Sequence, residues 1–287
     1  MTIAATPPVA SGFAARAIRH PSFVAGAVLT GFIILMALVS YVWTPYPPLE
    51  MTVSQRLKPP SAQWWLGTDA FGRDVASLIM AGARNSILVG VVAVGIGMTA
   101  GVAFGLYASA KRGWAEEIIM RLSDFVFAFP AILSAVMLTA LFGAGIENAI
   151  IAIGIFNVPV FARITRAAAN AVWAREFVLA ARAAGKGGFR ITVEHVLPNI
   201  VSILVVQATI QFAIAILAEA ALSYLGLGTR PPDPSWGRML NEAQAHIFRA
   251  PTLAVFPGIA IALAVLGLNL LGDGLRDLID PRLARKR

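Results

Sequence analysis

The chain has 287 residues, of which 58% are hydrophobic and only 13% charged, and its formal net charge is +8. Soluble domains contain about 25% charged residues and do not need this much apolar sequence to fill a core. The composition therefore excludes a soluble enzyme, a secreted disulfide scaffold and a disordered tail. The excess apolar surface is expected to face lipid, as in a polytopic membrane protein.

Six stretches are apolar enough to be membrane spans, because a charge at the bilayer centre is costly. In chain order they are residues 21–49, 85–110, 125–146, 148–162, 196–218 and 250–272. The first is too long for the apolar region of a cleaved signal peptide, so it is expected to remain as an anchor. The short stretch 148–162 ends at Arg163, and it is expected to span only if Arg163 and Arg166 extend to the interface.

The distribution of charge predicts the orientation. Six spans place both termini on the same side, and the positive-inside rule makes that side the cytoplasm. The inner segments then contain 16 of the 23 basic residues and eight of the 15 acidic ones. The outer segments have no net charge. The basic character of the chain is thus explained by its topology and gives no reason to expect a nucleic-acid partner.

Small and kinking residues occur at regular places in the spans. Gly97, Gly101 and Gly105 form a GxxxGxxxG stripe, which favours close packing of helices within the bundle over dimerisation. Prolines are expected to interrupt three spans, with hinges the less favoured explanation: Pro130, Pro159 and Pro257.

Polar residues within the spans are candidates for a transport pathway. Gln207 and Gln211 lie four residues apart and therefore on one helix face, and Asn157 lies in another span. These amides either line a pore or form hydrogen bonds between helices. Acidic residues are confined to the ends of the spans, which argues against a proton-coupled secondary carrier.

No enzyme active site is evident from the sequence. The three histidines are scattered and lack ligating neighbours, so no metal site is expected. The chain has no GxxxxGK[ST] phosphate loop and no GxSxG or HExxH pattern. It is therefore expected to be a non-catalytic membrane subunit without a cofactor of its own.

Residues 163–199 are expected to form a long inner loop with a helix, a glycine turn and a second helix. An apolar face is predicted at helical spacing, opposite a basic face: Trp173, Phe177, Ala181 and Ala184 against Arg175, Arg182 and Lys186. Gly185 has the place of a left-handed C-terminal residue, and a helix over 190–197 is expected to end at Pro198. Such a hairpin either lies on lipid or docks a soluble partner.

This loop resembles the EAA loop of ABC-importer permeases. The stretches 177–185 (FVLAARAAG) and 195–199 (HVLPN) carry the resemblance, with Leu179 in place of the general Glu, as in the peptide and nickel branch. Phe177 replaces the Tyr of that branch. In the family this loop couples the membrane subunit to a separate ATPase. The resemblance implies that role for Glu176, Ala180, Ala181, Arg182, Gly185, His195, Pro198 and Asn199.

Three further segments resemble the C-type subunits of dipeptide, oligopeptide and nickel importers. They are WLGTDAFGRD at 65–74, EAALSYLGLG at 219–228 with the prolines and PSWG up to 237, and NLLGDGLRD at 269–277 with DPR at 280–282. The four motifs occur in the order and topology of that family.

The resemblance implies an all-α membrane protein with the type I ABC-importer permease fold, six transmembrane helices and both termini cytoplasmic. Residues 1–83 would form an N-terminal tail, first helix and external segment, and residues 84–273 the ABC transmembrane type-1 domain with its coupling loop at about 163–199. Residues 274–287 would be a cytoplasmic tail. The implied location is the bacterial inner membrane, which the absence of cysteine fits.

The implied function is that of a permease subunit of an ATP-driven importer for di- or oligopeptides, with a nickel chelate or glutathione as alternative substrates. The implied partners are a second related permease, two ATPase subunits that bind ATP and Mg, an external substrate-binding protein and membrane lipid. The competing functions are a proton-coupled carrier and a non-transporting scaffold.

Overall fold

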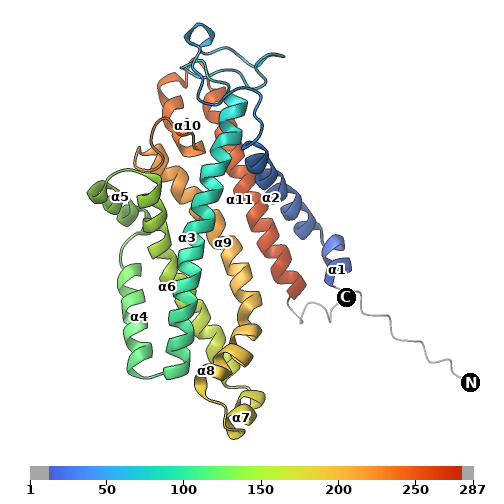
Figure 1. Cartoon of the computed structure of the whole chain (residues 1–287), viewed down its shortest axis with the longest axis vertical. Coiled ribbons are helices and arrows are strands. Elements are labelled where there is room, and N and C mark those ends of the chain that lie inside the picture. Colours follow the sequence, from blue (N-terminus) through green and yellow to red (C-terminus); the bar gives the residue numbers. More distant parts are fainter. Residues whose placement is uncertain (1–12, 280–287) are drawn as a thin grey trace, which may run out of the picture.

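The computed structural model describes residues 13–279, and in this part of the chain the regular structure is entirely helical. Five helices are long and apolar enough to cross a membrane: α2 (Pro21–Val39), α3 (Val75–Lys111), α6 (Ile146–Trp173), α9 (Leu197–Tyr224) and α11 (Thr252–Ile279). Shorter helices complete the bundle: α1 (Phe13–Arg19), α4 (Trp114–Phe127), α5 (Ala131–Phe142), α7 (Glu176–Ala183), α8 (Gly188–Ile191) and α10 (Trp236–Ala243). Figure 1 shows α7 at one end of the bundle and α10 at the other.

The predicted span 125–146 is not one helix. Helices α4 and α5 are bent by 83° against each other, so that α5 projects sideways from the bundle (Figure 1). The break lies at Pro130, which has no amide hydrogen and disfavours helical geometry at Phe129. In contrast, Pro159 and Pro257 lie inside the continuous helices α6 and α11, so the expected interruption of these two spans was wrong.

The predicted first span also needs correction, because α2 ends at Val39 rather than near residue 49. The region beyond it contains Pro45, Pro47 and Pro48, which prevent the helix from continuing. The 19 residues of α2 span about 28 Å at 1.5 Å per residue, which matches the hydrocarbon core of a bilayer.

The loop predicted at 163–199 is shorter than expected, because α6 extends through its first eleven residues to Trp173. Arg163 and Arg166 do not need to reach the interface alone: they form ion pairs with Asp124 and Glu116 of α4. The two arginines at the end of the short apolar stretch are thus neutralised by acidic residues of a neighbouring helix.

The second helix of the predicted hairpin does not end at Pro198. Helix α8 continues through a π-helical turn, Thr192–Val196, directly into α9. The wider turn carries Leu197 N–H to the carbonyl of Thr192, and Pro198 stands in the first turn of α9, where a missing amide hydrogen is tolerated.

Close packing of α3 and α6 depends on the glycine stripe, as predicted. A Cβ at Gly97 would collide with Asn157, one at Gly101 with Phe161, and one at Gly105 with Thr165. A second close contact joins α2 and α11, where Gly26 faces the backbone of α11 and Gly274 faces that of α2. These contacts fix the frame around which the functional elements are placed.

Candidate functional site

The turn after α7 has the geometry of a Schellman motif. Gly185 has a positive φ of 81°, its N–H donates to the carbonyl of Arg182 at 2.9 Å, and Lys186 N–H donates to that of Ala181 at 3.1 Å. The predicted left-handed glycine is confirmed. Nothing lies within 4 Å of the place of its Cβ, so the requirement for glycine comes from the backbone alone.

The faces of α7 differ from the prediction. Val178 and Ala181 are buried, whereas Phe177 is 46% and Leu179 54% exposed, and Ala184 is exposed. The prediction assumed one continuous helix from Trp173 through Ala184, but the chain is not helical at Ala174 and Arg175, so the face of α7 is rotated relative to that of α6. Helix α7 therefore presents apolar side chains outward, and Phe189 of α8, which is 84% exposed, adds to this surface.

The segment that follows folds back against α7. The ring of His195 lies 6.2 Å from that of Phe177, and Asn199 Nδ2 donates to the carbonyl of His195 at 2.7 Å. Residues from the two predicted stretches, 177–185 and 195–199, are thereby brought together. Arg182 instead turns back toward α6, with its guanidinium 4.9 Å from the ring centroid of Trp173.

One polar cluster in this region was missed by the sequence analysis. Glu194 accepts hydrogen bonds from Lys186 and Arg190, each at 2.5 Å, and Lys186 Nζ also lies 3.2 Å from His195 Nε2. The i,i+4 spacing of Arg190 and Glu194 was the available signal. The cluster closes the glycine turn over the start of the π-helical segment.

A cavity of about 590 Å³ lies between α5, α6 and α9. Asn157 and Gln211 line it, and each is only 5% exposed. Asn157 Nδ2 is buried without a hydrogen-bond partner in the described part of the chain. Gln207 is half-buried and does not line this cavity, so the structure brings together two of the three predicted amides.

The remaining lining of the cavity is apolar and includes the break between α4 and α5. Phe127, Phe129 and Pro130 contribute to it, together with Phe156 of α6. The residues at the break were missed as site residues, although Pro130 had marked the position. The result is an apolar chamber with two amide groups and no charged side chain in its lining.

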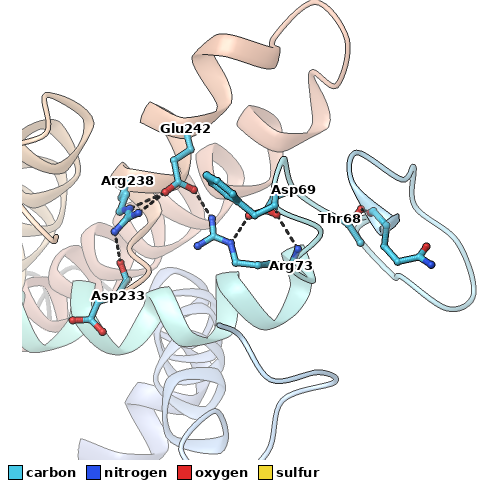
Figure 2. Close-up of polar contacts among 8 residues, drawn as sticks. Thr68, Asp69, Arg73, Asp233, Arg238 and Glu242 are labelled. Atoms are coloured by element: carbon cyan, nitrogen blue, oxygen red, sulfur yellow. Dashed lines mark hydrogen bonds and ion pairs between the residues drawn. The ribbon is translucent and has the colours of Figure 1, made fainter. Parts of the chain in front are cut away.

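At the opposite end of the bundle an ionic network holds the segment 65–74 against α10 (Figure 2). Arg73 donates to Asp69 and to Glu242, both at 2.6 Å, and Arg238 donates to Glu242 at 2.7–2.8 Å. Asp74 caps α3 by accepting from the amide of Ser77 at 2.8 Å. The acids and arginines of this motif thus position the segment between α2 and α3 against α10.

The segment 219–237 is anchored in the same region by buried groups. The Trp236 side chain is fully buried and its Nε1 donates to the carbonyl of Ile79 at 3.0 Å. Glu219, 1% exposed, accepts hydrogen bonds from Ser223 at 2.6 Å and from Ser86 at 3.3 Å. These contacts tie α9, α3 and α10 together.

Comparison with protein families and characterised proteins gives consistent matches. Residues 97–285 match the family described as binding-protein-dependent transport system inner membrane component, and residues 12–60 match the N-terminal transmembrane domain of oligopeptide transport permease C. The dipeptide transport system permease protein DppC of Alkalihalophilus pseudofirmus is 42% identical over 91% of this chain and 86% of its own length. The glutathione transport system permease protein GsiD of Pectobacterium atrosepticum is 42% identical over 90% and 87%.

A solved structure shares the fold. The inward-facing MetNI methionine ABC transporter contains a chain that superposes with a TM-score of 0.60, covering 71% of this chain and 97% of that one, at 18% sequence identity. At this identity the likeness concerns the arrangement of helices alone.

Proposed function

Because the chain belongs to the family of binding-protein-dependent transport system inner membrane components, we propose that it supplies half of the pathway through which an ATP-driven importer moves di- or oligopeptides. It is a multi-pass protein of the inner membrane and part of an ABC transporter with ATPase and binding-protein partners. The second half of the pathway would come from a related permease in a heterodimer. This subunit would itself be non-catalytic.

The observation that carries the proposal is the exposed apolar surface of Phe177, Leu179 and Phe189 beside the Schellman turn. Residues 188–224 form a helical stretch of 37 residues, about 55 Å long, which exceeds the roughly 30 Å hydrocarbon core. Helix α7 at its end is therefore expected to stand away from the bilayer surface. Apolar side chains in water favour a protein partner, and we assign this surface to an ATPase subunit that binds ATP and Mg.

The path of coupling would follow from the continuity of the chain. Helix α7 is joined through the glycine turn to α8, and α8 runs without interruption into α9, which carries Gln211 to the cavity. Movement of α7 on closure of the ATPase subunits would then shift one wall of the cavity as a rigid body. Glu176, Ala180, Ala181, Arg182, Gly185, His195, Pro198 and Asn199 would make up the coupling element.

The chemistry of the cavity suits a peptide. A peptide backbone offers neutral donors and acceptors, and Asn157 and Gln211 can satisfy them by hydrogen bonds, while the aromatic lining accepts varied side chains. A chamber without charged side chains imposes no strict requirement on the charge of the solute. Discrimination among peptides would then rest largely on the external binding protein.

The test is uptake of a labelled dipeptide, labelled glutathione and labelled nickel chelate in cells with and without the gene. Loss of dipeptide uptake alone is the expected result. Loss of glutathione uptake alone would keep the mechanism and change the substrate, for which the similarity to GsiD is the argument. Loss of nickel uptake alone would contradict the peptide assignment.

The other functional classes are separated by reconstitution. A proton-coupled carrier would transport peptide in vesicles that lack the ATPase subunits, and a scaffold would leave uptake of every solute unchanged on deletion. The importer requires ATP and the ATPase subunits for any accumulation of peptide.

A further inference from the structure

A second large hollow lies near the outer end of α2 and α3, far along these helices from the coupling element. It has a volume of about 490 Å³ and is formed by three segments: residues 40–49, residues 81–85 of α3, and Asp233 with Pro234. We call it the outer groove. The cavity of Asn157 and Gln211 shares no lining residue with it.

Arg84 is the basic residue of the outer groove. Its Nε donates to Ser40 Oγ at 2.6 Å, and its guanidinium lies 4.4 Å from the ring centroid of Tyr41. Within residues 13–279 it forms no ion pair, and its terminal nitrogens have no hydrogen-bond acceptor. A guanidinium held in place with free N–H groups is suited to an oxyanion such as a phosphate.

Asp233 is the acidic residue of the same groove. Its backbone carbonyl accepts a hydrogen bond from Arg238 at 3.3 Å, and Figure 2 shows its carboxylate directed away from that arginine. No ion pair to this carboxylate is formed in the described part of the chain. The outer groove therefore offers one cation and one anion that form no ion pair within residues 13–279.

The depth of the groove follows from the length of α2. A helix of 19 residues spans the hydrocarbon core, so the residues directly after Val39 lie at the level of the lipid headgroups. Tyr41, Val42 and Trp43 are 67%, 87% and 53% exposed there. Exposed aromatic residues at this level are typical of the membrane interface.

We propose that the outer groove binds the headgroup of a phosphatidylethanolamine molecule from the outer leaflet. Arg84 would hold the phosphate and Asp233 the ammonium group, while the acyl chains follow the lipid-facing side of α2. A phosphatidylglycerol headgroup has the phosphate but no ammonium, so Asp233 would disfavour it. The lipid would fix the outer ends of α2 and α3 at a defined depth. The inference depends on the membrane location and not on the transported solute.

The experiment is native mass spectrometry of the full transporter complex, released from vesicles of equal parts phosphatidylethanolamine and phosphatidylglycerol. The wild type is expected to retain phosphatidylethanolamine preferentially. Arg84→Ala should weaken retention of both lipids about fivefold, the effect of one basic contact with a lipid headgroup. Asp233→Asn should abolish the preference while keeping the binding. Arg249→Ala, an exposed arginine outside the groove, is the matched control and should behave as wild type.

Two controls separate lipid binding from folding. One is the variant Arg84→Lys, which keeps the charge, and the other is thermal unfolding of the variants in lipid-free detergent. Equal retention by the wild type and Arg84→Ala would overturn the proposal, as would an unchanged lipid preference in Asp233→Asn. Displacement of the lipid by a dipeptide or by inorganic phosphate would also overturn it, because the groove would then be a site for a soluble ligand.

Discussion

Gly185 shows how much a single backbone conformation can decide at the residue scale. Its φ of 81° costs an L-amino acid about 1 kcal/mol or more, and β-branched side chains are penalised most. Gly187, two residues later, has a φ of −70° and a ψ of 157°, which valine adopts readily, and it also has open space around it. The two glycines form a matched pair.

Gly185→Val is expected to lower peptide uptake and to weaken the dependence of ATPase activity on substrate, while Gly187→Val should retain most of both. The measurement is uptake and ATPase rate in reconstituted vesicles, normalised to the amount of assembled complex. Full activity of Gly185→Val would show that the left-handed turn is dispensable for coupling.

Asn157 allows the structural and the functional role of a polar side chain to be separated. Leucine has a similar shape but lacks the buried Nδ2, which has no hydrogen-bond partner in the described part of the chain. Removing such a buried polar group stabilises a fold by about 1–3 kcal/mol. Asn157→Leu is therefore expected to raise the thermal midpoint and to lower the rate of peptide uptake. Gln207→Leu, outside the cavity, is expected to leave uptake unchanged. Unchanged uptake in Asn157→Leu would contradict a role in the pathway.

At the scale of elements, α4 is tied to α6 by two ion pairs in addition to apolar contacts. Glu116 accepts from Arg166 at 2.6 Å, and the two side chains are 23% and 35% exposed. Glu117, the next residue, faces Arg121 at 3.7 Å with both side chains largely exposed. Removing one partner of a partly buried pair leaves a charge without compensation, whereas an exposed pair contributes close to zero.

Glu116→Gln is expected to lower the stability of the complex by up to about 1 kcal/mol, whereas Glu117→Gln should have no measurable effect. Thermal unfolding in detergent at low and at high salt provides the comparison. If both variants unfold at the same temperature, the pair between α4 and α6 does not support the helix.

Some features of the helices could be predicted from the sequence and others could not. The left-handed Gly185 was predictable because its backbone torsion belongs to a turn of a few residues. The stripe of Gly97, Gly101 and Gly105 was predictable because small residues four apart on one helix face favour close packing, although their partners lie in α6. The interruption of a span at Pro130 was also predicted and is confirmed, but the 83° bend was not, because an apolar stretch of sequence does not indicate the direction that the chain takes after a break. The exposure of Phe177 was also misjudged, since two non-helical residues after Trp173 change the phase of the following helix.

For the candidate site, the sequence identified two of the amides that line the cavity but could not exclude Gln207. Gln207 and Gln211 share a face by spacing alone, yet only one end of that face borders the chamber between α5, α6 and α9. The position of a cavity depends on how three helices pack, and no local pattern in one of them contains that information. The Lys186–Glu194 contact was missed for the same reason.

At the scale of the whole molecule, the orientation in the membrane remains a prediction from the charge distribution. The chain contains no cysteine, so single cysteines can be introduced without a background. Ser61→Cys lies exposed in the segment between α2 and α3, which is predicted to be external, and Ala184→Cys lies exposed beside the Schellman turn. An impermeant maleimide added to intact spheroplasts is expected to label the first and not the second, with both labelled after lysis. The reverse pattern would invert the topology.

Helix α3 links the two ends of the molecule mechanically. Its 37 residues make an unbroken rod about 56 Å long, capped at its N-terminus by Asp74 and packed tightly on α6 in its C-terminal half through three glycines. A rigid rod held at one place along its length acts as a lever: a tilt of about 5° moves one end by roughly 5 Å relative to the other. A force on the segment before α3 would thereby displace the opposite end of the helix without any change within it. Spin labels at the two ends of α3 would report such a tilt as opposite displacements relative to α11.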